Sequence, residues 1–136
     1  MKRVAKCSCG NLTIELEGDP KMVVACNCLK CQKRTGSVFG VSAYFNEDQV
    51  STVSGEKKVF SDISDENRKI KRNFCPSCGS TVYWSAEFMP SSVGVAVGCF
   101  ENPKFPEPVA SAWNESKHSW VRFPNNWRMS DTQKFG

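Results

Sequence analysis

The sequence predicts a mainly β fold, built from antiparallel sheets with at most short helical turns. Several segments alternate apolar and polar residues with the period of two that a half-buried strand requires. Turn signals separate these segments at the short spacing typical of an all-β domain, at Gly18 with Pro20, Gly55, Pro90, and Asn102 with Pro103. No long stretch has helical periodicity, so a helical or α/β fold is not expected.

The elements follow in chain order from these patterns. Residues 11–18 predict a strand with Leu12, Ile14 and Leu16 on the buried face. Residues 38–45 alternate in the same way, with Phe39, Val41, Ala43 and Phe45 inward, and residues 69–74 alternate through Ile70, Arg72 and Phe74. Further strands are expected at 21–25, 57–61, 80–85 and 92–99. One or two helical turns are expected from Cys28 to Lys33.

Length and composition indicate one soluble domain. With 136 residues the chain is about the usual size of a single domain, and we expect that domain over residues 1–125 and a loose tail over 126–136. No apolar run approaches the ~20 residues of a membrane helix. The start, MKRVAKCSCG, lacks the apolar stretch of a secretory signal. A cytoplasmic protein without a membrane partner is therefore expected.

Eight cysteines are a large excess for a chain of this size, and seven of them fall into three tight groups. The groups are Cys7 with Cys9, Cys26 with Cys28 and Cys31, and Cys75 with Cys78. In a reducing compartment such groups favour metal binding over a disulfide framework. Disulfides and free core thiols are the alternatives, and a thioredoxin-like role for Cys28 and Cys31 lacks the βαβ pattern it needs.

Two of the groups share the plan of a zinc knuckle. CSCG at 7–10 and CPSCG at 75–79 each place two cysteines in a turn followed at once by glycine, which can adopt positive φ. Each knuckle supplies two ligands, and structural zinc takes four. We therefore predict that Cys7, Cys9, Cys75 and Cys78 hold one zinc ion and staple the N-terminal strand to a central hairpin.

The remaining group predicts a second zinc site of a different kind. Cys26, Cys28 and Cys31 have no immediate glycine and no evident fourth partner, and three protein ligands with an open position are typical of a catalytic or ligand-binding zinc. Either Cys99 or His118 could close the site. Cys99, in an apolar segment predicted to be a strand, is expected to be a small buried residue, and His118 is expected to be exposed.

The charge of the chain argues against a nucleic-acid partner. The formal net charge is +4 with every thiol counted as neutral. A four-thiolate zinc site contributes −2 and a three-thiolate site −1, so the zinc-loaded protein carries only about +1. A basic binding face is poorly supported by that balance.

With these groups in view, the chain resembles the glutathione-dependent formaldehyde-activating enzyme family, which also includes centromere protein V. The resemblance rests on Cys7 to Gly10, on Cys26 to Cys31 running into Arg34, Thr35, Gly36 and Ser37, and on Arg72 to Ser80. Weaker similarities are Gly55 with Phe60, Gly98 to Pro103, and Trp120. Together they span nearly the whole chain.

The resemblance implies a β-tent fold, also found in a zinc-dependent chaperone of Rab GTPases, and the two zinc sites predicted above. It further implies a carbon–sulfur lyase that receives a thiol such as glutathione at Cys26, Cys28 and Cys31. Two departures concern the substrate. Many relatives carry histidine between the first two of these cysteines and again near Ser111, whereas this chain has Asn27 and no histidine there; a common leucine-aspartate pair appears as Phe100 and Glu101.

The leading hypothesis is an enzyme that joins or splits a thiol and a carbonyl compound at the open zinc, with Cys26, Cys28 and Cys31 as catalytic residues. Three thiolates make the zinc a poor Lewis acid toward water but leave it suited to a substrate thiol. Lys33 and Arg34 could hold carboxylates of a glutathione-like substrate, and Thr35, Gly36 and Ser37 could offer backbone donors. The alternative is a non-catalytic zinc-binding module that presents a surface to a protein or nucleic acid. The oligomeric state does not follow from the sequence.

Overall fold

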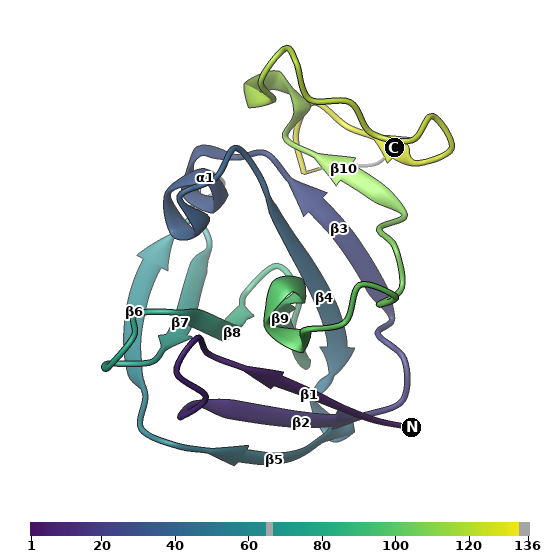
Figure 1. The fold of residues 1–136 in the computed structure, drawn as a ribbon. Coiled ribbons are helices and arrows are strands. Elements are labelled where there is room, and N and C mark those ends of the chain that lie inside the picture. Colours follow the sequence, from purple (N-terminus) through teal and green to yellow (C-terminus); the bar gives the residue numbers. More distant parts are fainter. Residues whose placement is uncertain (65–66, 134–136) are drawn as a thin grey trace. The chain divides into compact units, whose positions relative to one another are not determined.

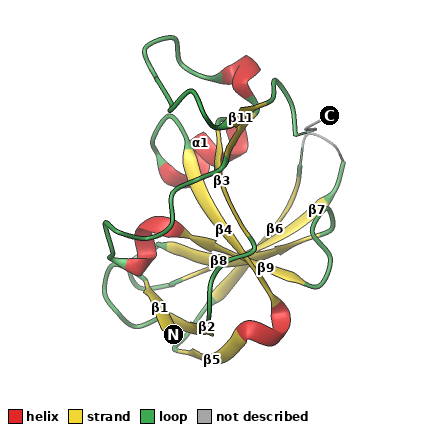
Figure 2. Cartoon of the chain, turned by 90° about the vertical axis from the view of Figure 1, so that its right-hand side faces the viewer, coloured by secondary structure: helices red, strands yellow, loops and turns green. Residues whose placement is uncertain are grey.

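Strands and loops account for most of the chain in the computed structural model, which describes residues 1–64 and 67–133 (Figures 1 and 2). The chain divides into two compact units. The first unit consists of residues 1–21 and 43–105, and the second of residues 22–42 and 106–136. The predicted fold class is confirmed: the sheets are largely antiparallel, and the one α-helix among the described residues is short.

A three-stranded antiparallel sheet in the first unit has the order β1-β2-β5. Its strands are β1 (Lys2–Lys6), β2 (Thr13–Glu17) and β5 (Val50–Ser54). The predicted inward face of β2 is confirmed, since Leu12, Ile14 and Leu16 are at most 1% exposed. The sequence reading missed β1 and β5, because β1 is dominated by charged residues and β5 is mostly exposed, so neither shows a clear alternation.

The second sheet of this unit has the order β4-β9-β8-β7-β6. Its strands are β4 (Gly40–Asn46, residues 43–46 in this unit), β6 (Lys58–Ile63), β7 (Lys69–Phe74), β8 (Thr81–Ala86) and β9 (Ser92–Ala96). The one-sided alternation predicted for residues 38–45 is wrong at Tyr44, which is only 6% exposed. Both faces of β4 are covered here, because the Tyr44 ring lies 6.4 Å from that of Phe88 and the Phe45 ring lies 6.1 Å from that of Phe100.

The predicted strand over 92–99 ends early. After β9 the chain turns into a short 3₁₀ helix, η2 (Val97–Phe100), and Glu101 follows with a left-handed φ of 57°. Cys99 therefore lies in a helical turn rather than in a strand. It is half-buried against the cluster of Ile70, Trp84 and Ala96.

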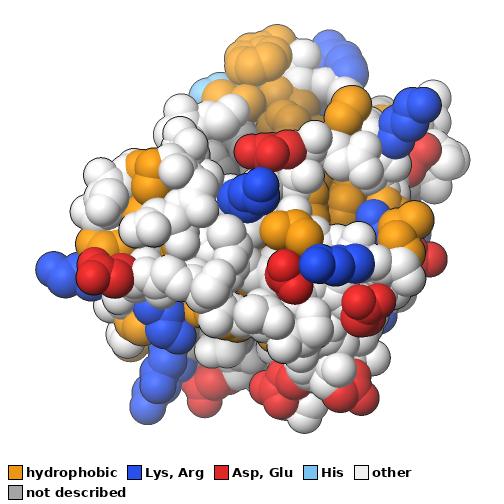
Figure 3. Space-filling view, turned by 60° about the horizontal axis from the view of Figure 1, so that its bottom comes forward, with side chains coloured by type: hydrophobic (Ala, Val, Ile, Leu, Met, Phe, Trp, Pro, Cys, Tyr) orange, Lys and Arg blue, Asp and Glu red, His pale blue; other side chains and the backbone are white. Residues whose placement is uncertain are grey.

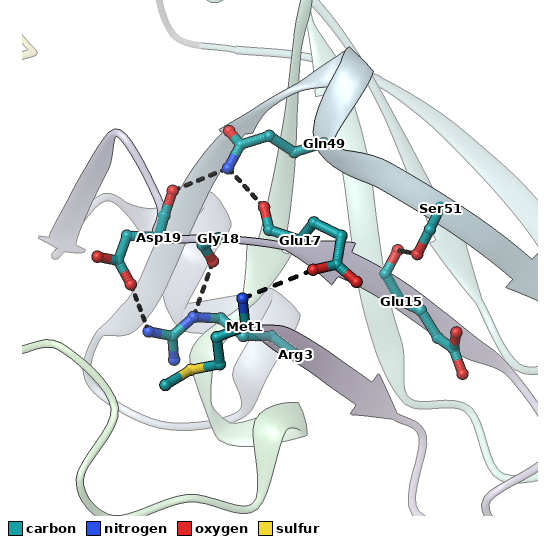
Figure 4. Close-up of polar contacts among 8 residues, drawn as sticks. All are labelled: Met1, Arg3, Glu15, Glu17, Gly18, Asp19, Gln49 and Ser51. Atoms are coloured by element: carbon teal, nitrogen blue, oxygen red, sulfur yellow. Dashed lines mark hydrogen bonds and ion pairs between the residues drawn. The ribbon is translucent and has the colours of Figure 1, made fainter.

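Side-chain hydrogen bonds connect β1 to the turn that follows β2 (Figure 4). The Arg3 guanidinium donates to Asp19 Oδ1 at 2.6 Å and to the Gly18 carbonyl at 2.9 Å. Gln49, in the 3₁₀ helix η1 (Glu47–Gln49), donates through Nε2 to the carbonyls of Glu17 and Asp19, both at 2.9 Å. These bonds fix the turn after β2.

The described residues of the second unit form three short strands, one helix and one 3₁₀ turn, beside residues 40–42 of β4. These are β3 (Met22–Cys26), α1 (Leu29–Thr35), β10 (Ala110–Ala112), η3 (Asn114–Ser116) and β11 (Arg128–Met129). The strands have the order β11-β10-β3, and both pairings are parallel. The expected short helix near Cys28 to Lys33 is confirmed by α1.

A single domain over 1–125 with a tail over 126–136 stays a prediction. Within that tail, β11 pairs with β10, and residues 134–136 lie outside the described part of the chain. Among the described residues, no helix is both long and apolar enough to span a membrane.

Candidate metal centres

The four-cysteine site, Cys7, Cys9, Cys75 and Cys78, lies entirely within the first unit. All four sulfurs lie within 4.8 Å of one another. The Cys7 and Cys9 Sγ atoms are 3.6 Å apart, and those of Cys9 and Cys75 are 3.7 Å apart. A tetrahedron with zinc–sulfur bonds of about 2.3 Å has sulfur–sulfur edges of about 3.8 Å. The site therefore fits a four-thiolate zinc ion.

Similar turns build the two halves of this site. In the first, the Cys7 N–H donates to the Leu12 carbonyl and the Gly10 N–H to the Cys7 carbonyl; in the second, the Cys75 N–H donates to Ser80 and the Gly79 N–H to Cys75. Gly10 and Gly79 have φ of 81° and 80°, the left-handed region that glycine adopts without strain. The glycine after each pair therefore has the role that the sequence predicted.

Polar contacts to the sulfurs surround this site. The Leu12 N–H donates to Cys7 Sγ at 3.1 Å. Ser80 Oγ lies 3.4 Å from Cys78 Sγ and accepts from the Ser8 N–H at 3.1 Å, so it links the two turns. Hydrogen bonds from the Ser80 side chain and backbone lower the pKa of Cys78 to about 5. These donors favour thiolates, the form that binds zinc.

The three-cysteine site, Cys26, Cys28 and Cys31, lies in the second unit, and its sulfurs also lie within 4.8 Å of one another. Cys26 ends β3, Cys28 is the N-cap of α1, and Cys31 lies in its first turn. The Cys28 sulfur accepts the Cys31 N–H at 3.3 Å, so one ligand also caps the helix. All three side chains are half-buried.

Mutual hydrogen bonding concentrates negative charge on one sulfur of this site. Contacts from the Cys26 and Cys31 thiols, in that order, lower the pKa of Cys28 to about 3. The contact with Cys28 is also the main reason that the pKa of Cys26 is raised. Three converging sulfurs, one of them readily ionised, suit a soft cation such as zinc.

Among the described residues, no fourth cysteine, histidine, aspartate or glutamate joins the three-cysteine group. His118 is exposed, and its ring lies 6.1 Å from that of Trp120. Cys99 lies within 3.8 Å of the Thr81 carbonyl in the first unit. A zinc ion at this site would thus keep one position for a further ligand.

The residues predicted to contact substrate follow the cysteines along α1 and its C-terminal turn. Lys33, Thr35, Gly36 and Ser37 are exposed, whereas Arg34 is half-buried. The hydrogen bond with Cys26 acts to lower the pKa of Cys31, but the contact with Cys28 and burial raise it to about 11; the Arg34 charge is a weaker lowering influence. Gly40 makes room for the guanidinium, because a Cβ there would lie 2.5 Å from Arg34 Nη2. Arg34 is therefore the cation of this segment most closely associated with the sulfurs.

The backbone donors predicted at 35–37 are already engaged. The Gly36 N–H donates to the Gln32 carbonyl at 2.8 Å, where Gly36 closes the helix with φ of 69°. The Ser37 N–H donates to Thr35 Oγ1 at 3.0 Å. Substrate contact by these residues stays a prediction.

The structure brings Asn27 and Ser111 into contact. Asn27 and Ser111 are both fully buried, and Asn27 Nδ2 donates to Ser111 Oγ at 3.0 Å. Sequence reasoning treated them as separate departures. Only the parallel pairing of β3 with β10, which sets Ala25 beside Ser111, shows that they form one contact.

Charge at the surface is mixed in sign on the face shown in Figure 3, where acidic and basic side chains lie interspersed. The formal net charge is +4 with every thiol neutral, and two occupied zinc sites would lower it to about +1. Neither observation favours a nucleic-acid interface.

Comparisons with known protein sequences indicate one protein family. A family model described as "Glutathione-dependent formaldehyde-activating enzyme" matches residues 2–116. Two proteins named "Putative glutathione-dependent formaldehyde-activating enzyme", from Fusarium vanettenii and Colletotrichum graminicola, are 34% identical to the chain over 82 and 84 residues. Each match covers 60% of this chain and 43% of the relative, so the chain matches less than half of each relative's length.

Among solved structures, a crystal structure of a Rhodobacter sphaeroides protein is similar, with a TM-score of 0.57 and 25% identity. The match covers 76% of this chain and 93% of that one. It extends the similarity in fold across most of both chains.

Proposed function

Since the chain belongs to the glutathione-dependent formaldehyde-activating enzyme family, we propose that it is a carbon–sulfur lyase that joins or splits a small thiol and an aldehyde, with glutathione and formaldehyde as the substrate pair. One observation carries the proposal: the three-cysteine site gathers three sulfurs without a fourth protein ligand among the described residues. A structural site would be expected to have four.

Zinc at this site would supply an open position that takes a thiol as thiolate and leaves its sulfur nucleophilic. In the synthetic direction, the thiol sulfur forms a bond to the aldehyde carbon while the carbonyl π bond breaks. The proton lost by the thiol ends on the carbonyl oxygen, so the reaction needs neither an oxidant nor a reductant. The reverse reaction splits the adduct.

The chain's own residues would hold and orient the thiol. Cys26, Cys28 and Cys31 fix the metal at the end of β3 and the start of α1. Arg34, half-buried and electrostatically coupled to Cys31, is the first candidate to bind a glutathione carboxylate, and the exposed Lys33 is the second. Holding the thiol by its carboxylate would orient its sulfur, which accelerates the reaction by proximity.

We also propose a second zinc, held without an open position by the four-cysteine site, and a cytoplasmic location. The support for the location is chemical, since exposed thiolate ligands such as Cys9 and Cys78 are preserved by a reducing environment.

Cobalt substitution tests the proposal directly. The thiolate charge-transfer absorption of the cobalt protein should grow as glutathione is added up to millimolar concentrations, because a fourth sulfur replaces a weaker ligand. Cys28→Ser protein is the matched control and should not respond. Exchange between formaldehyde and its glutathione adduct, measured by NMR, should be faster with the parent protein than with this control. A cobalt spectrum that does not change with glutathione, together with exchange no faster than in the control, would favour the non-catalytic zinc-binding module instead.

A further inference from the structure

Asn27 separates two sulfur ligands and is completely buried. Its side-chain Nδ2 lies within hydrogen-bond distance of three acceptors: the Ala112 carbonyl at 2.8 Å, Ser111 Oγ at 3.0 Å and Asn114 Oδ1 at 3.1 Å. A carbonyl can only accept, so the contact with Ala112 fixes which end of the amide faces this cluster. The side chain is thus anchored to β10 and to the start of η3.

Both backbone polar groups of Asn27 are also bonded. Its N–H donates to the Ala112 carbonyl at 3.0 Å. Its carbonyl accepts from Gln32 Nε2 at 2.9 Å and from Ser116 Oγ at 3.0 Å. The short link between Cys26 and Cys28 is therefore held from β10, from η3 and from α1.

The chemistry of this position calls for an uncharged donor. Aspartate would bring a carboxylate against the same three acceptors, and an apolar side chain would leave them without this donor. Asn27 Oδ1, in contrast, is buried and has no hydrogen-bond partner among the described residues. A buried unsatisfied acceptor destabilises a fold, so packing alone gives no reason for asparagine here.

We propose that Asn27 is the positioning residue of the three-cysteine site, with Ser111 and Asn114 as its anchors. By holding the peptide units on either side of it, Asn27 presents Cys26 and Cys28 in the geometry that the metal needs. The fold then orders this segment before the metal binds. The entropic cost of ordering it therefore does not reduce the metal affinity. The inference rests on the proposed function only in taking these three sulfurs as a metal site.

Metal affinity, measured without substrate, tests the proposal. Asn27→Leu has a similar shape but cannot donate, and it should lower cobalt affinity at the three-cysteine site by roughly 10- to 100-fold in competition with a chelator. The weak visible absorption bands of cobalt should change as well, because the tetrahedral arrangement loosens. The four-cysteine site should keep its metal.

A matched pair of variants keeps the test decisive even when Asn27→Leu does not fold. Asn114→Asp retains the oxygen that accepts from Asn27 Nδ2 and from Ser111 Oγ, so its cobalt affinity should stay within about twofold of the parent. Asn114→Leu removes that acceptor and should lower the affinity several-fold. Equal affinities for Asn114→Leu and the parent, or equal losses for both Asn114 variants, would overturn the proposal.

The outcome is separable from that of the proposed function. If glutathione does not change the parent's cobalt spectrum while Asn27→Leu and Asn114→Leu lose cobalt affinity, the enzyme proposal fails and the positioning role stands. If glutathione binds but these variants keep the parent's metal affinity, the positioning role fails and the enzyme proposal stands.

Discussion

The four-cysteine site joins two turns that are distant in the sequence, since even their nearest cysteines, Cys9 and Cys75, lie 66 residues apart. The three-cysteine site, in contrast, is formed by the end of one strand and the start of one helix. In the former, Cys7 and Cys75 are at most 2% exposed and Cys9 and Cys78 are exposed. In the latter, all three sulfurs are half-buried and no fourth ligand joins them among the described residues. The difference supports the proposal that the first site stabilises the fold and that the second is available for chemistry.

The largest expected effect is loss of the fold on removal of one ligand from the four-cysteine site. Cys78 is exposed, so Cys78→Ser changes little packing and acts through the metal. Structural zinc contributes roughly 10 to 16 kcal/mol of apparent binding free energy, which equals or exceeds the stability of a typical domain. We expect aggregated protein or a greatly lowered melting temperature. A soluble Cys78→Ser protein with the parent's melting temperature would contradict the structural role.

Removal of a ligand from the three-cysteine site should lower the zinc content without unfolding the protein. Cys28→Ser should leave a folded protein, because these sulfurs connect only neighbouring segments. Zinc content after anaerobic preparation should fall from two ions per chain toward one, as measured by metal analysis. Parent protein with fewer than two ions, or unfolded Cys28→Ser protein, would count against the division of roles.

A smaller effect is expected at the cation beside the open site. Arg34→Gln removes a charge that could bind a substrate carboxylate, and charge-assisted hydrogen bonds contribute about 1.5 to 3 kcal/mol. The KM for glutathione should rise roughly 10- to 100-fold in the NMR exchange assay, with melting little changed. Lys33→Gln removes the second candidate cation, at an exposed position, and should raise the KM less. Equal effects of the two variants would indicate general electrostatic attraction rather than a specific contact.

The smallest effect is expected for Ser80→Ala at the four-cysteine site. The variant removes the hydroxyl that contacts Cys78 Sγ and the Ser8 N–H, both in exposed positions. Water can replace these bonds, so the free energy of unfolding should fall by no more than about 1 kcal/mol. Chemical denaturation of the zinc-loaded protein measures the change, and zinc content should stay at two. Loss of zinc would show that Ser80 is as necessary as a ligand.

The extent to which the sequence predicted this structure depends on how local each signal is. The alternation that predicts β2 and the two cysteine-glycine turns are local patterns, and they correspond to the elements observed. Tyr44 was misassigned because both faces of β4 are buried at this point, which one-sided alternation cannot represent. The end of β9 was missed because a 3₁₀ turn continues an apolar run without changing its composition.

The candidate sites show the same limit. Cysteine spacing predicted the three-cysteine group and each half of the four-cysteine group, and the four ligands that structural zinc takes predicted that the two halves join. The support of Cys26 and Cys28 by Asn27 was beyond sequence reasoning, since the partners of its side chain lie 84 to 87 residues away and meet it only through the parallel pairing of β3 and β10.

The long separation between the two halves of the four-cysteine site has a consequence for biosynthesis. While the chain is emerging from the ribosome, Cys7 and Cys9 must wait for Cys75 and Cys78, and closing a loop of 66 residues carries an entropic cost of roughly 4 kcal/mol. The cysteines at 26, 28 and 31 emerge together and can capture an ion much earlier. Zinc supply during translation would then act first on the local site and only later on the one that completes the fold.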